Sequence, residues 1–183
     1  VNFARWIYKT ATGLIEVKTW STANQDQINL SIHSSVAQQF VISHNLVAGV
    51  NEDDSLPLIS YAANNTVIIQ PDANELICSK NPQARFVITP FVSDDVAQIA
   101  GGEVFTSFKS AVDLPYLVYE TKLVCEFGLS IQAQLVPTHE LSFEVADFAL
   151  QVMEFELQWF KKINQFSLTH SSNAVVGQFN DLM

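Results

Sequence analysis

Basic residues are scarce in this chain of 183 residues, and their scarcity excludes one large class of partners. Nine lysines and arginines stand against nineteen aspartates and glutamates, which gives a formal net charge of −10. A protein that binds a phosphate backbone needs a basic surface to release counterions. The only adjacent basic pair is Lys161-Lys162. We therefore do not expect nucleic acid as a partner.

Long apolar runs are also missing, and no run approaches the ~18 residues of a membrane span. No signal-peptide pattern opens the chain, although its start at Val1 leaves open the removal of an earlier segment. The two cysteines, Cys78 and Cys125, both fall in strand-like runs, and we expect free buried thiols rather than a disulfide. Free thiols favour a reducing compartment, so the expectation is a cytoplasmic protein without a membrane partner.

Glycine and proline are sparse, at six each, and neither a linker nor an internal repeat is visible. Hydrophobic residues make up 48% of the chain, and the mean hydropathy is +0.17. These values predict one domain over residues 1–183, with extra strands in 1–34 and a carboxyl-terminal tail in 166–183.

Patterns that carry chemistry are absent as well. The four histidines are dispersed, and none shares a cysteine or carboxylate at a recognised ligand spacing. No Gly-x-Ser-x-Gly elbow occurs, and Gly101-Gly102 matches no phosphate-binding loop. The sequence therefore predicts no metal, no cofactor and no catalytic residue, and hence a protein that is not an enzyme.

An amphipathic pattern between Thr138 and about Gln165 is the clearest feature that is present. Apolar residues recur there at alternating steps of four and three, which places them on one helical stripe; they are Leu141, Val145, Phe148, Val152, Phe155 and Trp159. We expect this long helix to be the main support of the core.

Strict alternation from Leu117 to Leu135 predicts strand, with the odd positions facing inward. A two-residue hairpin would switch the inward parity, so the unbroken parity favours one long bent strand or a hairpin with an odd loop. Short runs at 58–61, 66–70, 75–79 and 85–92, separated by turn residues such as Asn64-Asn65, predict an antiparallel meander.

The remaining segments complete the expected fold. A kinked or split helix should follow Ser93, with apolar positions from Val96 to Val112. Near the amino end, the runs 6–9 and 14–20 flank a turn at 11–13. Apolar residues then alternate at Ile28, Leu30 and Ile32, and 35–48 is expected to be helical. The fold class predicted is α+β: an antiparallel sheet of about five or more strands packed against two or three helices.

This order of elements, with the small size and a pI near 4.6, resembles the fold of the small acidic chaperones of type III secretion and their YbjN-like relatives. The resemblance covers about Ser35 to Gln165 and implies a homodimer that binds an extended segment of another protein on its sheet and helix faces.

The functional expectation is accordingly a non-enzymatic, chaperone-like or adaptor-like module with another protein as its partner. The expected partner-binding residues are Val118 and Val124, on the outer face of the 117–135 segment, together with Phe105 and Phe108. Two alternatives stay open: a structural or assembly subunit of a virus or filament, and a carrier or enzyme for an apolar small ligand.

Overall fold

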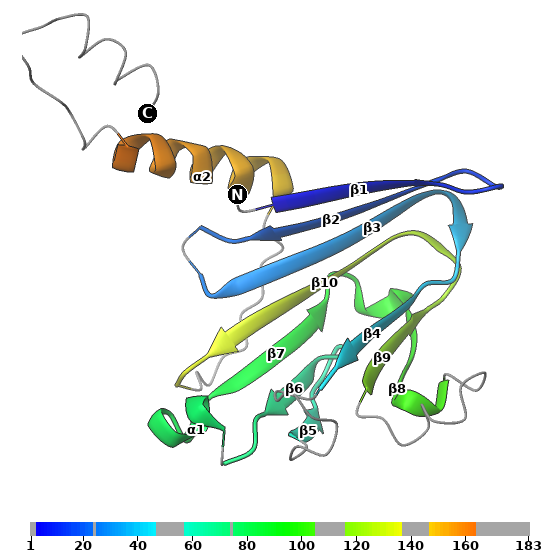
Figure 1. Cartoon of the computed structure of the whole chain (residues 1–183). Helices are drawn as coiled ribbons and strands as arrows, with labels where there is room; N and C mark the ends of the chain where they lie inside the picture. The colour runs from blue at the N-terminus through cyan, green and yellow to red at the C-terminus, as the bar shows by residue number, and fades with distance from the viewer. Residues whose placement is uncertain are drawn as a thin grey trace, which may run out of the picture.

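A computed structural model describes residues 3–23, 25–46, 57–73, 75–104, 116–136 and 147–163, and these residues form a β-sandwich (Figure 1). Seven strands make one antiparallel sheet in the order β1-β2-β3-β10-β7-β6-β5, and three make a second in the order β4-β9-β8. Their bounds are β1 Phe3–Lys9, β2 Leu14–Ser21, β3 Gln27–Gln38, β4 Val41–Asn45, β5 Leu58–Tyr61, β6 Val67–Gln70, β7 Arg85–Pro90, β8 Val96–Ala100, β9 Tyr116–Thr121 and β10 Val124–Gln134. The α-helices among the described residues are α1 Leu76–Lys80 and α2 Phe148–Ile163. The predicted α+β class is therefore wrong, because the second layer of the domain is a sheet and not a set of helices.

The amino-terminal strands follow the alternation of their sequence. β1 and β2 pair from Phe3↔Trp20 to Lys9↔Leu14, and the turn between them is closed by the Thr10 N–H, which donates to the Gly13 carbonyl at 2.8 Å. β3 contains the alternating isoleucines but continues to Gln38, and β4 begins three residues later. The helix expected over 35–48 is therefore wrong for residues 35–46, which the structure describes. Pairing with β10 and β9 holds this segment extended, which overrides a weak helical pattern.

The predicted meander is present as β5, β6 and β7, with one change. Asn64 and Asn65 connect β5 to β6 with φ of 59° and 56°. Asparagine tolerates this left-handed conformation. The Thr66 N–H donates to the Ala63 carbonyl at 3.3 Å, so Asn64 and Asn65 are the central residues of the turn. The run at 75–79, predicted as strand, instead forms the short helix α1 between β6 and β7.

The helix predicted after Ser93 is also wrong within the described residues. A single 3₁₀ turn, η1 Ser93–Asp95, leads directly into β8, and a second, η2 Gly102–Val104, follows it. β8 pairs with β9 from Val96↔Thr121 to Ala100↔Val118, so sheet pairing decides the conformation here. The rest of the predicted helix, 105–112, lies outside the described residues.

The unbroken parity of the 117–135 segment has a cause that neither predicted alternative included. β9 and β10 are separated by only Lys122 and Leu123, yet they belong to different sheets. Because the chain crosses from one layer to the other, odd positions can face the interior on both sides of the corner. Leu117 and Tyr119 in β9 and Phe127 in β10 are all buried. Cys125 is exposed beside the corner, which contradicts the expectation of a buried thiol.

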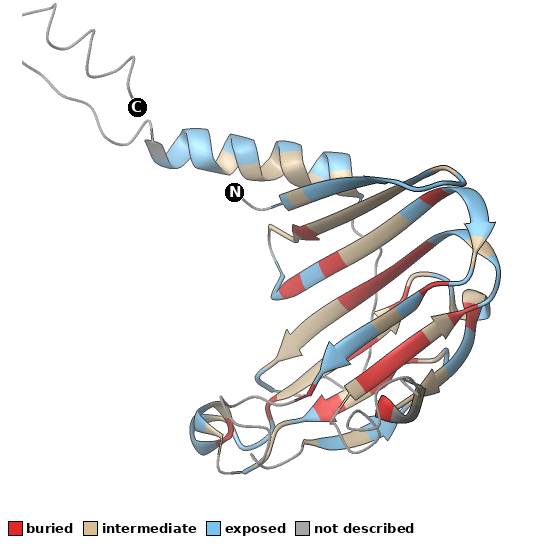
Figure 2. Cartoon of the chain, turned by 45° about the vertical axis from the view of Figure 1, so that its right-hand side comes forward, coloured by how far each residue is buried: buried red, intermediate tan, exposed pale blue. Residues whose placement is uncertain are grey.

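The core lies between the two sheets (Figure 2). Its buried residues come from both layers: Phe40, Leu46, Val67, Ile69, Ile88, Val96, Leu117, Tyr119, Phe127 and Leu129. The Tyr119 hydroxyl donates to the carbonyls of Asn65 at 3.1 Å and Ile88 at 3.4 Å, and burial raises the pKa of this phenol.

α2 packs on the opposite face of the larger sheet and takes no part in this core, so its predicted role as the main core support is wrong. Phe148 makes edge-to-face contacts with Phe3 and Trp20, and the Ala23 N–H donates to Gln151 Oε1 at 3.0 Å. Leu150, Met153, Leu157, Trp159 and Phe160 are exposed. The amino end predicted for this helix, at Thr138, lies outside the described residues. Neither described helix has the length and apolar character that a membrane crossing requires.

Candidate functional site

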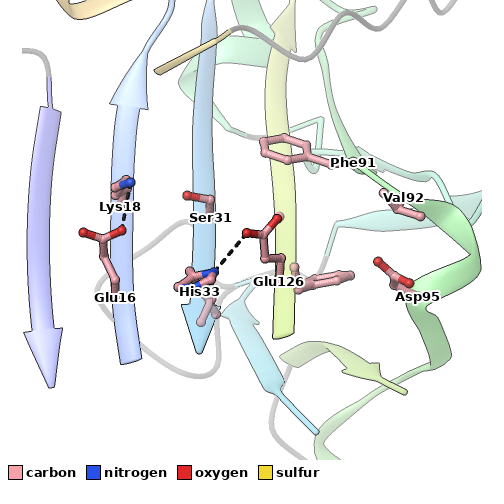
Figure 3. Close-up of a pocket in the computed structure, with 11 residues that line it drawn as sticks. Glu16, Lys18, Ser31, His33, Phe91, Val92, Asp95 and Glu126 are labelled. Atoms are coloured by element: carbon pink, nitrogen blue, oxygen red, sulfur yellow. Dashed lines mark hydrogen bonds and ion pairs between the residues drawn. The ribbon is translucent and has the colours of Figure 1, made fainter. Parts of the chain in front are cut away.

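Strand register gathers charged side chains on the face of the larger sheet that turns away from the core. Glu16 pairs with His33, and His33 pairs with Glu126, so β2, β3 and β10 place these three residues in one row. In the next row Lys18 pairs with Ser31, and Ser31 with Gly128. Figure 3 shows these side chains on the same face of three neighbouring strands.

Two ion pairs organise this surface. Lys18 Nζ lies 2.8 Å from Glu16 Oε2, and the Arg5 guanidinium contacts Glu16 Oε1 from β1. The hydrogen bonds from Lys18 and then from Arg5 lower the pKa of the Glu16 carboxyl, so it is ionised at neutral pH. His33 Nδ1 and Glu126 Oε1 are 2.9 Å apart, and both side chains remain more than half exposed. Glu126 and His33 therefore keep polar atoms available to a ligand.

An aromatic ring stands above Gly128. A Cβ atom on Gly128 would lie 2.2 Å from Phe91 Cδ2, so only glycine leaves room for the ring. The Phe91 N–H donates to the Gly128 carbonyl at 2.9 Å, and Trp20 contacts the ring with 6.2 Å between the centroids. These contacts hold Phe91 in place after β7 ends.

The charged rows and the aromatic ring enclose a cleft of about 490 Å³. Asp95, in the 3₁₀ turn that follows Phe91, completes its rim (Figure 3). The cleft therefore combines three carboxylates, one ammonium group, one imidazole and one hydroxyl with an aromatic wall. Such a mixture suits a ligand with many hydroxyl groups and an apolar face, because carboxylates accept from hydroxyls and aromatic rings contact C–H groups.

A second cavity, of about 400 Å³, opens between the two sheets at the other end of the sandwich. Its lining is mainly apolar, with Ile28, Phe86 and Ile131 among the residues, and His44 stands at its margin. Partial burial lowers the pKa of His44. Fewer polar groups converge on this cavity than on the first cleft.

Metal binding has no support in the part of the chain that the structure describes, where no three histidine, cysteine or acidic side chains come together at one point. Two of the cleft's carboxylates form ion pairs instead, Glu16 with Arg5 and Lys18 and Glu126 with His33.

Of the residues predicted to bind a partner, the structure describes Val118 and Val124. Val118 is fully buried in β9, and Val124 is packed against the core. Phe105 and Phe108 lie outside the described residues. Of the two thiols, Cys78 is buried and Cys125 is exposed.

Sequence reasoning missed the cleft because its residues are spread from position 16 to position 128. The four histidines are dispersed in the sequence, and Glu126 falls at an even position of the 117–135 segment, whose odd positions were predicted to face inward. The available signal was Gly128 inside a strand, since an internal glycine marks a close approach of another group.

Comparison with known proteins identifies one family. The family model of the glycoside phosphorylase supersandwich domain matches residues 1–133, a range that includes both sheets and nearly all of the cleft-lining strands. No curated protein matches the sequence. At the level of a domain, the family match overturns the prediction that the protein is not an enzyme.

Proposed function

Because the chain belongs to the glycoside phosphorylase supersandwich domain family, we propose that it binds the saccharide of a glycoside phosphorylase in the cleft over β2, β3 and β10. A glycoside phosphorylase breaks a glycosidic bond with inorganic phosphate, so its reaction involves a neutral sugar chain and an anion. The observation that supports the saccharide is the cleft itself, in which the Phe91 ring is surrounded by charged hydrogen-bonding groups.

The shape and lining of the cleft suit a sugar ring. Its volume of about 490 Å³ falls in the range of roughly 300–1,000 Å³ that small-molecule sites occupy. Phe91 offers an aromatic surface for the C–H face of a pyranose, while Glu126 accepts from hydroxyl groups and Lys18 donates to them. Hydrogen bonds to charged groups are the stronger kind, so a few of them can orient a neutral ligand.

The carboxylates of the cleft disfavour binding of phosphate, the second substrate of a glycoside phosphorylase. Glu16, Asp95 and Glu126 face the space in which a phosphate would lie, and Lys18 is already engaged with Glu16. Bringing a phosphate dianion beside these carboxylates costs Coulomb energy that one shared ammonium group does not offset. We therefore assign the sugar to this cleft and place the phosphate elsewhere.

Titration of the chain with a panel of di- and trisaccharides that differ in linkage tests the proposal. The readouts are calorimetry and amide chemical shifts, and inorganic phosphate is titrated separately. At least one saccharide should bind and shift the amides of β2, β3 and β10. Phe91→Ala and Glu126→Gln should each weaken that binding about tenfold or more.

Matched control variants lie on exposed surfaces away from the cleft. Tyr61→Ala removes an exposed aromatic ring at the opposite edge of the larger sheet, and Glu156→Gln removes an exposed carboxylate on α2. Neither should alter saccharide affinity. Thermal melting of each variant separates loss of binding from loss of folding. Binding that survives both cleft variants, or phosphate that competes with the sugar, would contradict the assignment.

A further inference from the structure

Helix α2 lies on the face of the larger sheet that carries the cleft, and Figure 1 shows it beside the amino end of β1 and the carboxyl end of β2. The side chains of Lys18 and Trp20, at alternate positions of β2, point to that face. The Phe148 ring, at the start of α2, meets Trp20 edge to face, with 5.4 Å between the ring centroids. Lys18 Nζ lies 5.3 Å from the centroid of the same ring, within the range of a cation–π interaction. One residue of α2 therefore contacts two outward side chains of β2.

The first of these contacts reaches the cleft directly. Lys18 and Glu16 both line the cleft, and Lys18 Nζ is 2.8 Å from Glu16 Oε2. A lysine side chain has many rotamers, so each further contact narrows the positions that its ammonium group occupies. The Phe148 ring supplies such a contact from α2. It therefore helps to fix the donor that the cleft offers to a sugar hydroxyl.

The second contact reaches the cleft through one intermediate ring. Trp20 is only 4% exposed, and its ring lies between two partners, Phe148 and Phe91. The Phe91 ring forms the aromatic wall of the cleft and packs tightly over Gly128. Closely packed side chains transmit a displacement instead of absorbing it, because the interior has low compressibility. The position of Phe148 therefore constrains the aromatic wall as well as the ammonium group.

Docking of α2 has a reporter of its own outside the cleft. The Ala23 N–H donates to Gln151 Oε1 at 3.0 Å, one helical turn after Phe148. Ala23 follows the end of β2, beyond the cleft-lining residue Lys18. This amide loses its acceptor when α2 leaves the sheet. Hydrogen exchange at Ala23 therefore measures docking of α2 without a contribution from groups that touch the sugar.

We propose that Phe148 is a positioning residue of the cleft, so that docking of α2 and binding of saccharide favour each other. The inference rests on the proposed function for its ligand, whereas the contacts of Phe148 with Trp20 and Lys18 hold without it. The family match ends at residue 133 and assigns nothing to α2. Coupling between two sites is reciprocal, so saccharide must strengthen docking by the factor by which docking strengthens saccharide binding.

The first experiment uses no ligand. Phe91→Ala removes the ring on the far side of Trp20 and leaves α2 unchanged. Exchange at the Ala23 amide should become about threefold faster or more, since the loosened Trp20 ring holds Phe148 less well. Tyr61→Ala, at the opposite edge of the sheet, should leave this rate unchanged. Exchange of the β10 amides in the same samples shows that the fold is retained.

The second experiment adds the member of the di- and trisaccharide panel that binds the wild type most tightly. Saturation should slow exchange at Ala23 about threefold or more. Phe148→Ala should weaken saccharide binding about tenfold, and Phe148→Leu, which keeps apolar volume but loses the ring, about threefold. Phe148→Tyr keeps the ring and should bind as the wild type does. Leu150→Ala is the matched control, because Leu150 is an exposed apolar residue of the same turn.

Each outcome decides between positioning and a merely structural role. If Phe148→Ala melts at a lower temperature but binds saccharide normally, or if saccharide leaves exchange at Ala23 unchanged, the proposal is overturned. Unchanged exchange at Ala23 in Phe91→Ala also overturns it. If no saccharide binds the wild type, the proposed function fails, and the ligand-free experiment alone decides whether α2 and the cleft are coupled.

Discussion

Replacing Gly128 with alanine tests whether the Phe91 ring is fixed over the sheet. The new Cβ would lie 2.2 Å from Phe91 Cδ2 and 2.4 Å from Cε2, whereas ordinary van der Waals contact begins at 3.4 Å. The ring cannot yield freely, because the Phe91 N–H is bonded to the Gly128 carbonyl and the ring packs against Trp20.

The expected cost follows from overpacking. Forcing one extra carbon into a packed site typically costs about 1–3 kcal/mol, and displacing the ring from Trp20 adds up to roughly 0.5–1.5 kcal/mol. Alanine otherwise suits a strand interior better than glycine by roughly 0.5–1 kcal/mol. We expect a net loss of about 1–3 kcal/mol in the free energy of unfolding, measured by urea denaturation.

The effect of Gly128→Ala on the free energy of unfolding should change sign once the Phe91 ring is removed. In a Phe91→Ala background, Gly128→Ala should stabilise the protein by about 0.5–1 kcal/mol, because only the backbone preference remains. Ser130→Ala is the matched control in the same strand. Its buried hydroxyl has no hydrogen-bond partner among the described residues, so its loss should be neutral or slightly stabilising. Equal effects of Gly128→Ala in both backgrounds would refute the close approach of the ring.

Three further predictions test other parts of the fold. Asn64→Gly should leave thermal stability nearly unchanged, whereas Asn64→Val should cost about 1–2 kcal/mol, because φ is 59° there. Tyr119→Phe should cost about 1–3 kcal/mol in urea denaturation, since the Ile88 carbonyl loses a buried donor. Burial raises the pKa of Tyr119. The stability that the protonated phenol contributes is therefore complete below the unfolded pKa of about 10 and declines as the pH rises above it. The wild type should lose stability faster than Tyr119→Phe in that range. A thiol reagent should modify Cys125 rapidly in the native protein and Cys78 only on unfolding; rapid reaction of both would contradict the burial of Cys78.

Alternation of apolar and polar residues predicted most strands correctly, because this pattern is typical of a strand that buries one face when it pairs into a sheet. Leu117 and Tyr119 of β9 and Phe127 and Leu129 of β10, all buried, are examples. The turn at Asn64-Asn65 was confirmed from local chemistry. Prediction failed where tertiary pairing chose the conformation. Val96 and Ile99 fit a helix as well as a strand, and their pairing with β9 decides between the two.

The aromatic residues of α2 misled for a different reason. Apolar residues at helical spacing predicted a core helix, but Phe148 packs outside the sandwich. Of the other described residues of the stripe, Val152 and Phe155 are half-buried and Trp159 is exposed. The periodicity of apolar residues shows which face of a helix or strand is apolar. It does not show which other element packs against that face. The element order that carried the resemblance to secretion chaperones is not the observed one. Binding of another protein stays a prediction.

The candidate site could not be predicted for a reason of topology. Glu16, His33 and Glu126 become neighbours only through the pairing of β2 with β3 and of β3 with β10. The sequence separation between His33 and Glu126 is 93 residues, so no local motif contains both.

The position of β10 in the larger sheet has a consequence for how the chain is made. β1, β2 and β3 form one group, β5, β6 and β7 form another, and β10 alone joins them. On a ribosome, neither group can complete its pairing until residue 134 has emerged, and the inner edges of β3 and β7 are open until then. Open strand edges invite pairing with other nascent chains, and long-range closure is slow. Translation past β10, rather than completion of either half, is thus the moment at which this domain becomes safe from aggregation.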